Sequence, residues 1–182
     1  LIECIGEVIK GDEFNEIKNF IKYWTSEEGY PLITFENDPS QPDKIGTIHQ
    51  SRFTNNGTIE LEGDKAWPLP LFILRKKKGT GEIVEEKIIF DKQTMSIRNL
   101  VEESEWVKLN PGYKSFCRVW YKGDNLKKLT SAIKDKSIDA IERWSIIYDS
   151  INVAKANLMP YGDVIELLDA YSNEDGYLAA TQ

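Results

Sequence analysis

Apolar residues recur every three or four positions near the start of the chain, which predicts an amphipathic helix from Asp12 to about Ser26. The stripe consists of Phe14, Ile17, Ile21 and Trp24. Asp12 stands where an N-terminal cap is needed. Residues 1–10 are too few to cover this stripe and build a domain around it, so we expect its packing partner to lie upstream. The first residue is Leu1 rather than Met, and we expect that the start of the protein has been removed.

From Tyr30 onward, short β-rich runs alternate with turn sequences such as Asn56-Gly57 and Asn110-Pro111-Gly112. The predicted strands are Pro31–Phe35, Lys44–Phe53, Thr58–Glu62, Leu69–Lys76, Ile83–Phe90, Met95–Ile97, Trp106–Leu109 and Ser115–Tyr121. Many short strands with a turn every eight to twelve residues or so are typical of an antiparallel β-sandwich.

After Tyr121 the apolar period becomes helical again. Three stripes follow one another: Leu126, Leu129 and Ile133; then Ile138, Ile141, Trp144, Ile147, Tyr148, Ile151 and Ala154; then Val164, Leu167, Leu168 and Tyr171. Pro160 lies near the start of the third helix, where its missing N–H costs nothing. We therefore predict a mixed fold, an antiparallel β-sandwich flanked by an N-terminal helix and a C-terminal helical, α-solenoid-like segment. The predicted units are residues 1–29, 30–121 and 122–182.

Composition narrows the classes of partner. The 182 residues carry a formal charge of −7, which argues against nucleic acid because phosphate binding needs clustered Lys and Arg. We interpret the one basic run, Arg75 to Lys78, as a solvated hairpin tip. No apolar run is long enough to span a bilayer, so no membrane contact is expected. Asn56-Gly57-Thr58 fits the glycosylation pattern but indicates a loop more reliably than secretion, and we favour a cytoplasmic location.

Candidate chemistry is limited by the histidine content. A zinc hydrolase needs three protein ligands and a base, whereas this chain has a single histidine, His49, on a predicted strand. Cys4 and Cys117 are far apart, and we expect both to be buried thiols. We interpret His49 as a strand residue hydrogen-bonded at the sheet surface. Any Ser-His-Asp or Cys-His arrangement would have to use the same imidazole.

The carboxylates Glu102, Glu103 and Glu105 are close in sequence, but acid–base work needs carboxylates in different, partly desolvated environments. We interpret them as a charged loop before Trp106. The sequence therefore predicts no catalytic, cofactor-binding or metal-binding residue in this chain.

Several local motifs follow one another in a defined order. Trp24 is followed by Gly29-Tyr30-Pro31, then by Gln50-Ser51-Arg52-Phe53 and by Trp67-Pro68-Leu69-Pro70-Leu71. Further on come Trp106-Val107-Lys108-Leu109-Asn110, Phe116, Arg118-Val119, Tyr121, Arg143 and Asp149. In this order and spacing they resemble motifs of the M1 family of zinc aminopeptidases, which contains aminopeptidase N and the tricorn-interacting factors. The departures from the family pattern are Ser115 and Asn157 for Gly, Cys117 for an aromatic residue and Trp120 for Asn.

The resemblance implies that the chain combines the end of the catalytic domain, the sandwich domain and the opening helices of the C-terminal domain. Positions matching the HExxH helix, its downstream Glu, the GAMEN motif and the transition-state Tyr are absent here, and they would lie upstream. It follows that no catalytic residue can be carried over. Zinc and peptide substrates would belong to the parent enzyme, whose missing catalytic domain and remaining helical domain would be the partners of this inactive fragment.

Two residues at family positions receive structural roles in this interpretation. Arg118 should pair with a carboxylate or carbonyl groups near the junction between sandwich and helices, and Asp149, at the margin of a buried stripe, should need a donor. A competing hypothesis has Arg118 hold the C-terminal carboxylate of a substrate. For the whole chain, the alternative to a fragment is a free-standing protein-interaction module; a small enzyme that uses only carboxylates has no positive evidence.

Overall fold

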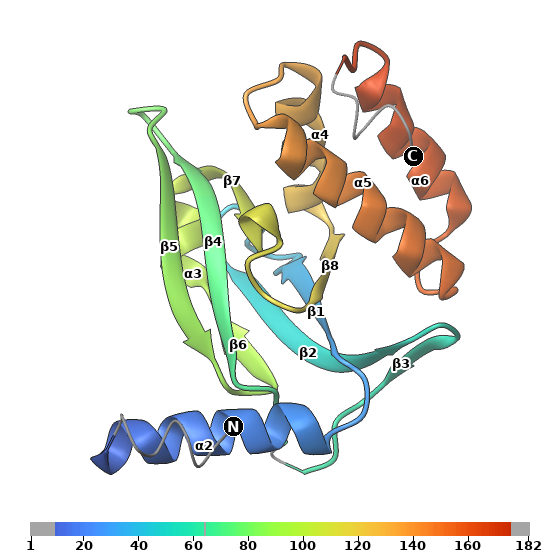
Figure 1. Ribbon diagram of the computed structural model, residues 1–182. Coiled ribbons are helices and arrows are strands. Elements are labelled where there is room, and N and C mark those ends of the chain that lie inside the picture. Colours follow the sequence, from blue (N-terminus) through green and yellow to red (C-terminus); the bar gives the residue numbers. More distant parts are fainter. Residues whose placement is uncertain (1–9, 64, 176–182) are drawn as a thin grey trace.

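The computed structural model describes residues 10–63 and 65–175. Its helices and strands follow one another along the chain in an order of helix, strands, helices (Figure 1). The strands are β1 (Pro31–Asn37), β2 (Gly46–Thr54), β3 (Gly57–Ile59), β4 (Leu69–Lys77), β5 (Ile83–Phe90), β6 (Thr94–Ser96), β7 (Ser104–Leu109) and β8 (Arg118–Lys122). The helices are α2 (Gly11–Ser26), α3 (Arg98–Glu102), α4 (Asp124–Lys134), α5 (Ala140–Lys155) and α6 (Tyr161–Leu168), with the 3-10 turns η1 (Pro111–Tyr113) and η2 (Asp169–Tyr171).

The strands form two sheets. One has the order β3-β2-β1-β8, with β6 also paired to β2, and the other has the order β5-β4-β7. In Figure 1, α4, α5 and α6 lie together beside the sheets, whereas α2 lies across one end of them. The fold is thus a mixed arrangement of helices and two sheets, rich in antiparallel pairs.

One strand pair contradicts the prediction of a purely antiparallel arrangement. β8 runs parallel to β1, with Ile33 opposite Val119 and Phe35 opposite Tyr121. Antiparallel neighbours can be joined by a tight turn, but a parallel pair requires a long crossover. Here the crossover contains β2 to β7, including the whole second sheet. A strand pattern read locally carries no information about such a distant pairing.

Both sheets contribute to a common hydrophobic core. Inward residues of β2 and β4 alternate with half-buried ones, which is the period expected of strands with one buried face. Gln50 lies fully buried in this core, and its side chain forms hydrogen bonds with backbone groups that have no access to water. Its Nε2 donates to the carbonyls of Trp67 and Phe90, each at 3.1 Å, and its Oε1 accepts from the Trp67 N–H at 3.0 Å. The side chain thereby joins β2 to the segments that flank the second sheet.

The helical segment is tied to the sheets by a second buried amide. Asn125, in the first turn of α4, donates from Nδ2 to the Val107 carbonyl at 2.7 Å and accepts from the Val107 N–H at 3.0 Å. Because β7 is the last strand of its sheet, this amide occupies the place of a neighbouring strand. At Val107 the outer edge of β7 is therefore satisfied without a further strand.

Helix α5 is followed by a left-handed residue, Asn157, at a position where the family pattern has Gly. Asn157 has φ of 59°. Its N–H donates to the Ala154 carbonyl at 2.9 Å, and the Leu158 N–H donates to the Val153 carbonyl at 3.1 Å. These two bonds form a Schellman motif. Asn thus replaces the usual Gly at modest cost, because Asn tolerates this conformation better than most residues.

Several local predictions were wrong. The strand expected over Thr58–Glu62 is only β3, and the strand expected from Ser115 begins at Arg118. Of the charged loop expected at Glu102, Glu103 and Glu105, Glu102 is the last residue of α3 and Glu105 lies in β7. Because α2 begins at Gly11, Asp12 lies in the first turn and not at the cap.

The basic run is not a solvated hairpin tip throughout. Arg75 is buried in β4 and its Nη2 lies 2.6 Å from Glu86 Oε1. Lys76 and Lys77 pair with Glu105 and Glu82 at 2.7 and 2.8 Å. Only the end of the run reaches the turn between β4 and β5, so most of its charge is neutralised within the fold.

In the described part of the chain, no helix has both the length and the apolar character needed to cross a bilayer.

Candidate functional site

A group of buried polar and charged residues lies where the sheets meet the helices. Between β7 and β8 the backbone takes an unusual path, with φ of 53° at Asn110, 62° at Gly112 and 51° at Tyr113. We call residues 110–117 the junction loop. The Asn110 side chain closes it: Oδ1 accepts from the Ser115 N–H at 2.8 Å and Nδ2 donates to the Ser115 carbonyl at 2.9 Å. These bonds stabilise a conformation that non-glycine residues adopt only rarely, and they explain why β8 starts late.

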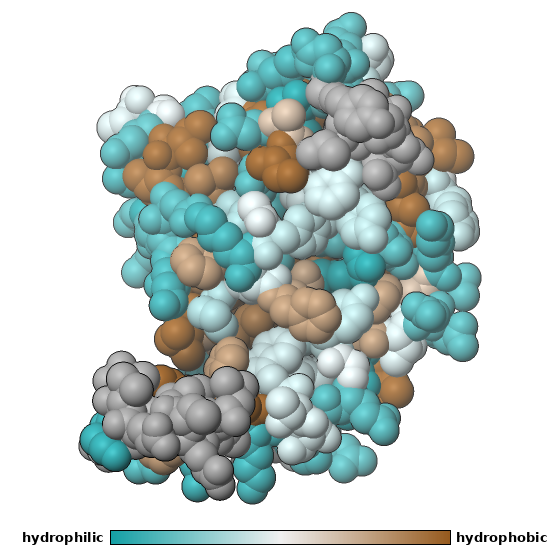
Figure 2. All heavy atoms as spheres, viewed as in Figure 1, coloured by the Kyte–Doolittle hydropathy of each residue, from teal (hydrophilic) through white to brown (hydrophobic). Residues whose placement is uncertain are grey.

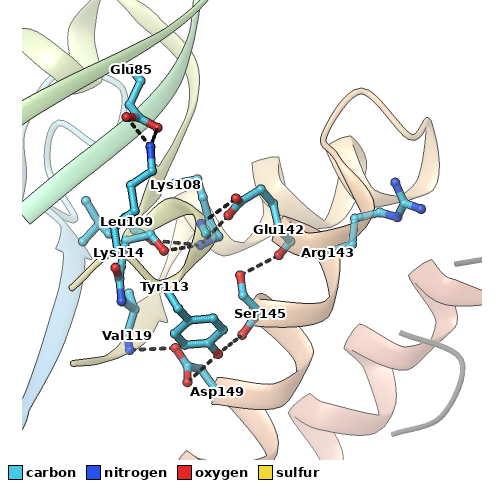
Figure 3. Close-up of polar contacts among 12 residues, drawn as sticks. Glu85, Lys108, Leu109, Tyr113, Lys114, Val119, Glu142, Arg143, Ser145 and Asp149 are labelled. Carbon is cyan, nitrogen blue, oxygen red and sulfur yellow. Dashed lines mark hydrogen bonds and ion pairs between the residues drawn. The ribbon is translucent and has the colours of Figure 1, made fainter. Parts of the chain in front are cut away.

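Asp149 on α5 accepts hydrogen bonds from this loop and from β8, the strand that follows it (Figure 3). Its Oδ2 accepts from the Val119 N–H at 3.0 Å. Its Oδ1 accepts from Tyr113 Oη and from Arg118 Nη1, both at 3.1 Å. Since the residue is only 4% exposed, these contacts replace water around the carboxylate. The carboxylate expected beside Arg118 is therefore that of Asp149. The same bond supplies Asp149 with the donor that it was expected to need.

A second buried carboxylate on α5 holds the start of the junction loop. Lys108 Nζ lies 3.0 Å from Glu142 Oε2, and both side chains are less than a tenth exposed. Glu142 Oε1 accepts from the Gly112 N–H at 2.7 Å, while Lys108 Nζ also donates to the Leu109 carbonyl at 2.8 Å. Figure 3 shows these contacts next to the Asp149 cluster, on the same helix. Two carboxylates of α5 thus fix one loop.

Arg118 is enclosed by aromatic rings. Its Nε donates to Tyr30 Oη at 2.9 Å, and its guanidinium carbon lies 5.3 Å from the Phe53 ring centroid and 5.2 Å from that of Tyr148. The side chain is 16% exposed. These contacts are of the kind that stabilise a partly desolvated cation.

Burial changes the acidity of several groups in this cluster. Removal from water raises the pKa of Asp149 to about 6, against opposing contributions from the Val119 N–H and Arg118. Burial also lowers the pKa of Lys108, although Glu142 acts in the opposite direction. Desolvation raises the pKa of the Tyr113 hydroxyl and the Cys117 thiol above their ordinary values. Because Cys117 is buried and harder to ionise, it is not an activated nucleophile.

The structure brings some of the family-motif residues together and separates others. Tyr30, Arg118 and Asp149 meet directly. Tyr121 donates to and accepts from the backbone of Leu109 inside the same region.

The remaining family-motif residues belong to three other places. Gln50 contacts Trp67, whereas Arg143 forms a two-bond pair with Glu174 at 2.6 and 2.7 Å. At the entry to β1, Gly29 has φ of 81°, and a Cβ there would lie 3.2 Å from Arg52 Cγ. Trp24, Pro31, Phe53, Trp106 and Asn110 pack in or against the core.

Sequence reasoning missed Lys108, Glu142 and Tyr113 as members of the cluster. A signal was present for Lys108, because it stands between Val107 and Leu109 in a strand whose last four residues are all buried. A lysine in such a strand requires a buried counter-charge. Tyr113 offered no signal, since its role depends on the left-handed conformation of the loop.

The described residues do not fit a zinc site. His49 Nε2 lies 2.8 Å from Glu60 Oε2, and Nδ1 lies 2.9 Å from Thr94 Oγ1. No group of three or more His, Cys, Asp or Glu side chains within residues 10–63 and 65–175 is arranged to hold a metal ion. Cys4 lies outside the described residues.

Comparisons with known proteins connect the chain to a family of peptidases. Residues 106–182 match the sequence model described as the ERAP1-like C-terminal domain. The chain is 21% identical over 178 residues to tricorn protease-interacting factor F2 of Thermoplasma volcanium, covering 98% of this chain and 20% of that protein. It is 25% identical over 150 residues to aminopeptidase N of Homo sapiens, covering 79% of this chain and 14% of that protein.

A plant relative agrees with these matches. Aminopeptidase M1-A of Oryza sativa subsp. japonica is 24% identical over 167 residues, which cover 88% of this chain and 18% of that protein. Over most of its length the chain is similar to aminopeptidases of the M1 family. It spans a fifth or less of the length of these M1 relatives. The match to the ERAP1-like C-terminal domain begins at Trp106 in β7. It therefore includes the junction loop and the α5 carboxylates of Glu142 and Asp149.

Proposed function

We propose that this chain is a non-catalytic segment of a longer M1-type zinc aminopeptidase, in which the two sheets separate a catalytic part from a helical part. The observation that carries the proposal is the coverage: 98% of the chain aligns with only 20% of tricorn protease-interacting factor F2. In the parent, zinc and peptide substrates would belong to the part that this chain does not contain. His49, already engaged with Glu60 and Thr94, is not available as a zinc ligand.

The domain division follows the chain order. Residues 1–29 would be the end of the catalytic domain, residues 30–121 a β-sandwich, and residues 122–182 the opening of an α-solenoid-like domain. The shared core of the two sheets and the buried bonds from Asn125, Glu142 and Asp149 support a spacer that transmits little flexibility. A rigid connection of this kind would hold the flanking domains at a fixed separation.

The proposal predicts that the purified chain releases no amino acid from aminoacyl anilides, with or without added zinc. The expected rate equals that of buffer, because the chain has a single histidine and its described residues hold no group of three metal ligands. The measurement is anilide absorbance after the preparation has been passed through a second, orthogonal column. A His49→Ala variant serves as the control: zinc-dependent release that is lost in this variant would overturn the proposal, and release unaffected by it would identify a contaminant.

One observation favours the second candidate, a free-standing interaction module. Phe116 is 68% exposed and lies with its ring centroid 5.2 Å from Tyr30 and 6.0 Å from Trp24. Phe20 of α2 is 39% exposed, and its ring centroid lies 6.0 Å from that of Trp24. Figure 2 shows one face of the molecule, on which side chains of intermediate and apolar hydropathy gather in the region between α2 and α5. Exposed aromatic side chains of this kind are frequent in protein interfaces.

The two candidates differ in the expected behaviour of α2. It packs through Trp24, whose Nε1 donates to the Pro68 carbonyl at 3.0 Å, but its described side chains are half-buried or exposed. For a segment of a longer enzyme we expect concentration-dependent dimerisation and binding of a hydrophobic dye, both weakened by Phe20→Ser. Sedimentation velocity over a hundredfold concentration range measures the first. A chain that stays monomeric over the whole concentration range and binds no hydrophobic dye would favour the free-standing interaction module instead.

A further inference from the structure

The Asp149 carboxylate lies at a contact between three elements that are separate in the sequence. It projects from α5, and its partners are the N–H of Val119 in β8, the guanidinium of Arg118 in β8 and the hydroxyl of Tyr113 in η1. Any movement of α5 away from β8 must break these contacts and admit water to the carboxylate. The state of this one group is therefore coupled to the closure of the junction.

The charged and titratable groups that face Asp149 come from every element packed around it. They are Lys108 of β7, Tyr113 of η1, Cys117 of the junction loop, Arg118 and Tyr121 of β8, and Glu142 of α5 itself.

Two of these six groups carry a positive charge. Lys108 lies 3.0 Å from Glu142 and is engaged there. Arg118 reaches Asp149 through one hydrogen bond, from Nη1 at 3.1 Å, and its Nε donates to Tyr30 Oη instead. By contrast, Arg143 holds Glu174 with two bonds at 2.6 and 2.7 Å. The single bond between Arg118 and Asp149 is thus a weaker ion-pair geometry than the two bonds between Arg143 and Glu174. The Asp149 carboxylate is nevertheless almost completely removed from water. In such a site the cost of desolvation exceeds the Coulombic gain.

We propose that Asp149 makes the junction a latch that protons tighten: uptake of a proton in mildly acidic solution strengthens the closure of α5 on β8, and ionisation near neutrality weakens it. The sign follows from linkage. Burial raises the pKa of Asp149 to about 6 in the closed junction, from 3.8 for a hydrated aspartate. The closed form then binds more protons than the open form between these values. The stabilisation is complete below about pH 4 and is lost as the pH rises through about 6. This inference concerns the chain itself and does not rest on the proposed function.

Hydrogen exchange at the Val119 amide tests the latch, because this N–H donates to Asp149 Oδ2 and is released when the junction opens. After correction for the intrinsic exchange rate, we expect the opening constant to be about tenfold larger at pH 7 than at pH 5. In an Asp149→Asn variant the opening constants at pH 7 and pH 5 should be equal, since the side-chain amide of the introduced asparagine does not titrate. Asp163→Asn, at an exposed position in α6, is the matched control and should keep the tenfold ratio.

Two results would overturn the latch. One is an opening constant that is larger at pH 5 than at pH 7, because it would mean that the ion pair with Arg118 outweighs desolvation. The other is an unchanged ratio in Asp149→Asn. If that variant does not fold, a carbon-13 titration of the Asp149 carboxyl in the unaltered chain decides. A midpoint near 6 supports the latch, and a midpoint at or below 4 contradicts it.

Discussion

Replacing Asp149 with alanine is expected to lower the free energy of unfolding by about 3–5 kcal/mol, the range measured when one partner of a buried charge pair is removed. The change removes the acceptor for the Val119 N–H, the Tyr113 hydroxyl and the Arg118 guanidinium at once. The Val119 N–H and the Arg118 Nη1 lose the acceptor that Asp149 supplied, whereas the Tyr113 hydroxyl keeps the Ser145 carbonyl at 3.2 Å. A buried donor left without a partner is more costly than the loss of a bond alone. Urea denaturation followed by tryptophan fluorescence gives the free energy of unfolding.

The controls for Asp149→Ala separate its contacts. Asp163→Ala, exposed on α6, should change the free energy of unfolding by less than about 0.5 kcal/mol. Arg118→Ala should lose less than Asp149→Ala because the Val119 and Tyr113 bonds remain. In the double variant the losses should be smaller than their sum, since the two side chains share one contact. A loss of under about 1 kcal/mol for Asp149→Ala would contradict the assignment of Asp149 as the centre of the junction.

The hypothesis that Arg118 serves a substrate carboxylate receives little support from the geometry. Its guanidinium is already opposite Asp149, and Tyr30 takes its Nε. An incoming carboxylate would have to share a cation whose charge is balanced within the fold. A structural role predicts that Arg118→Ala lowers the melting temperature, and that in a longer relative it affects peptides of all lengths alike.

The sequence predicts the helices and most strands because their apolar periods are local properties. The stripe from Ile138 to Ala154 identifies α5. Short elements were harder, because α3 has only five residues and little room for a period. The parallel contact of β8 with β1 was beyond local reasoning, because it depends on how the chain returns after crossing the second sheet.

The candidate site was predicted only in part, for a physical reason. Arg118 lies on a partly buried strand, and Asp149 lies at the margin of a buried helical stripe. The sequence therefore predicted a polar partner for each of them. That they would satisfy one another depends on the angle at which α5 meets β8, which no sequence spacing specifies. Tyr113 joins them only because the loop enters the left-handed region at three of its residues. Loop geometry of this kind is stabilised by the contacts it creates, and local propensity does not predict it.

Replacing Glu142 with alanine is the second large expected effect, because it leaves the Lys108 ammonium, 3% exposed, without its counter-charge. We expect a loss of about 3–5 kcal/mol in the free energy of unfolding, with Gly112 also losing the acceptor of its N–H. Burial lowers the pKa of Lys108 and Glu142 opposes this effect, so removing Glu142 should lower the pKa of Lys108 further. The unfolded variant then binds more protons than the folded one between that lowered pKa and 10.5, over a wider pH window than in the unaltered chain, so the loss should shrink as the pH rises through this window.

The matched control replaces both partners with apolar residues of similar size, Lys108→Met and Glu142→Leu. Because no charge then remains buried, most of the lost stability should return, apart from about 1 kcal/mol for the Gly112 N–H. Urea denaturation of the two single variants and the double variant completes the cycle. If the double variant were as unstable as the sum of the two single variants, the pair would not interact, and Glu142 would act on the junction through Gly112 alone.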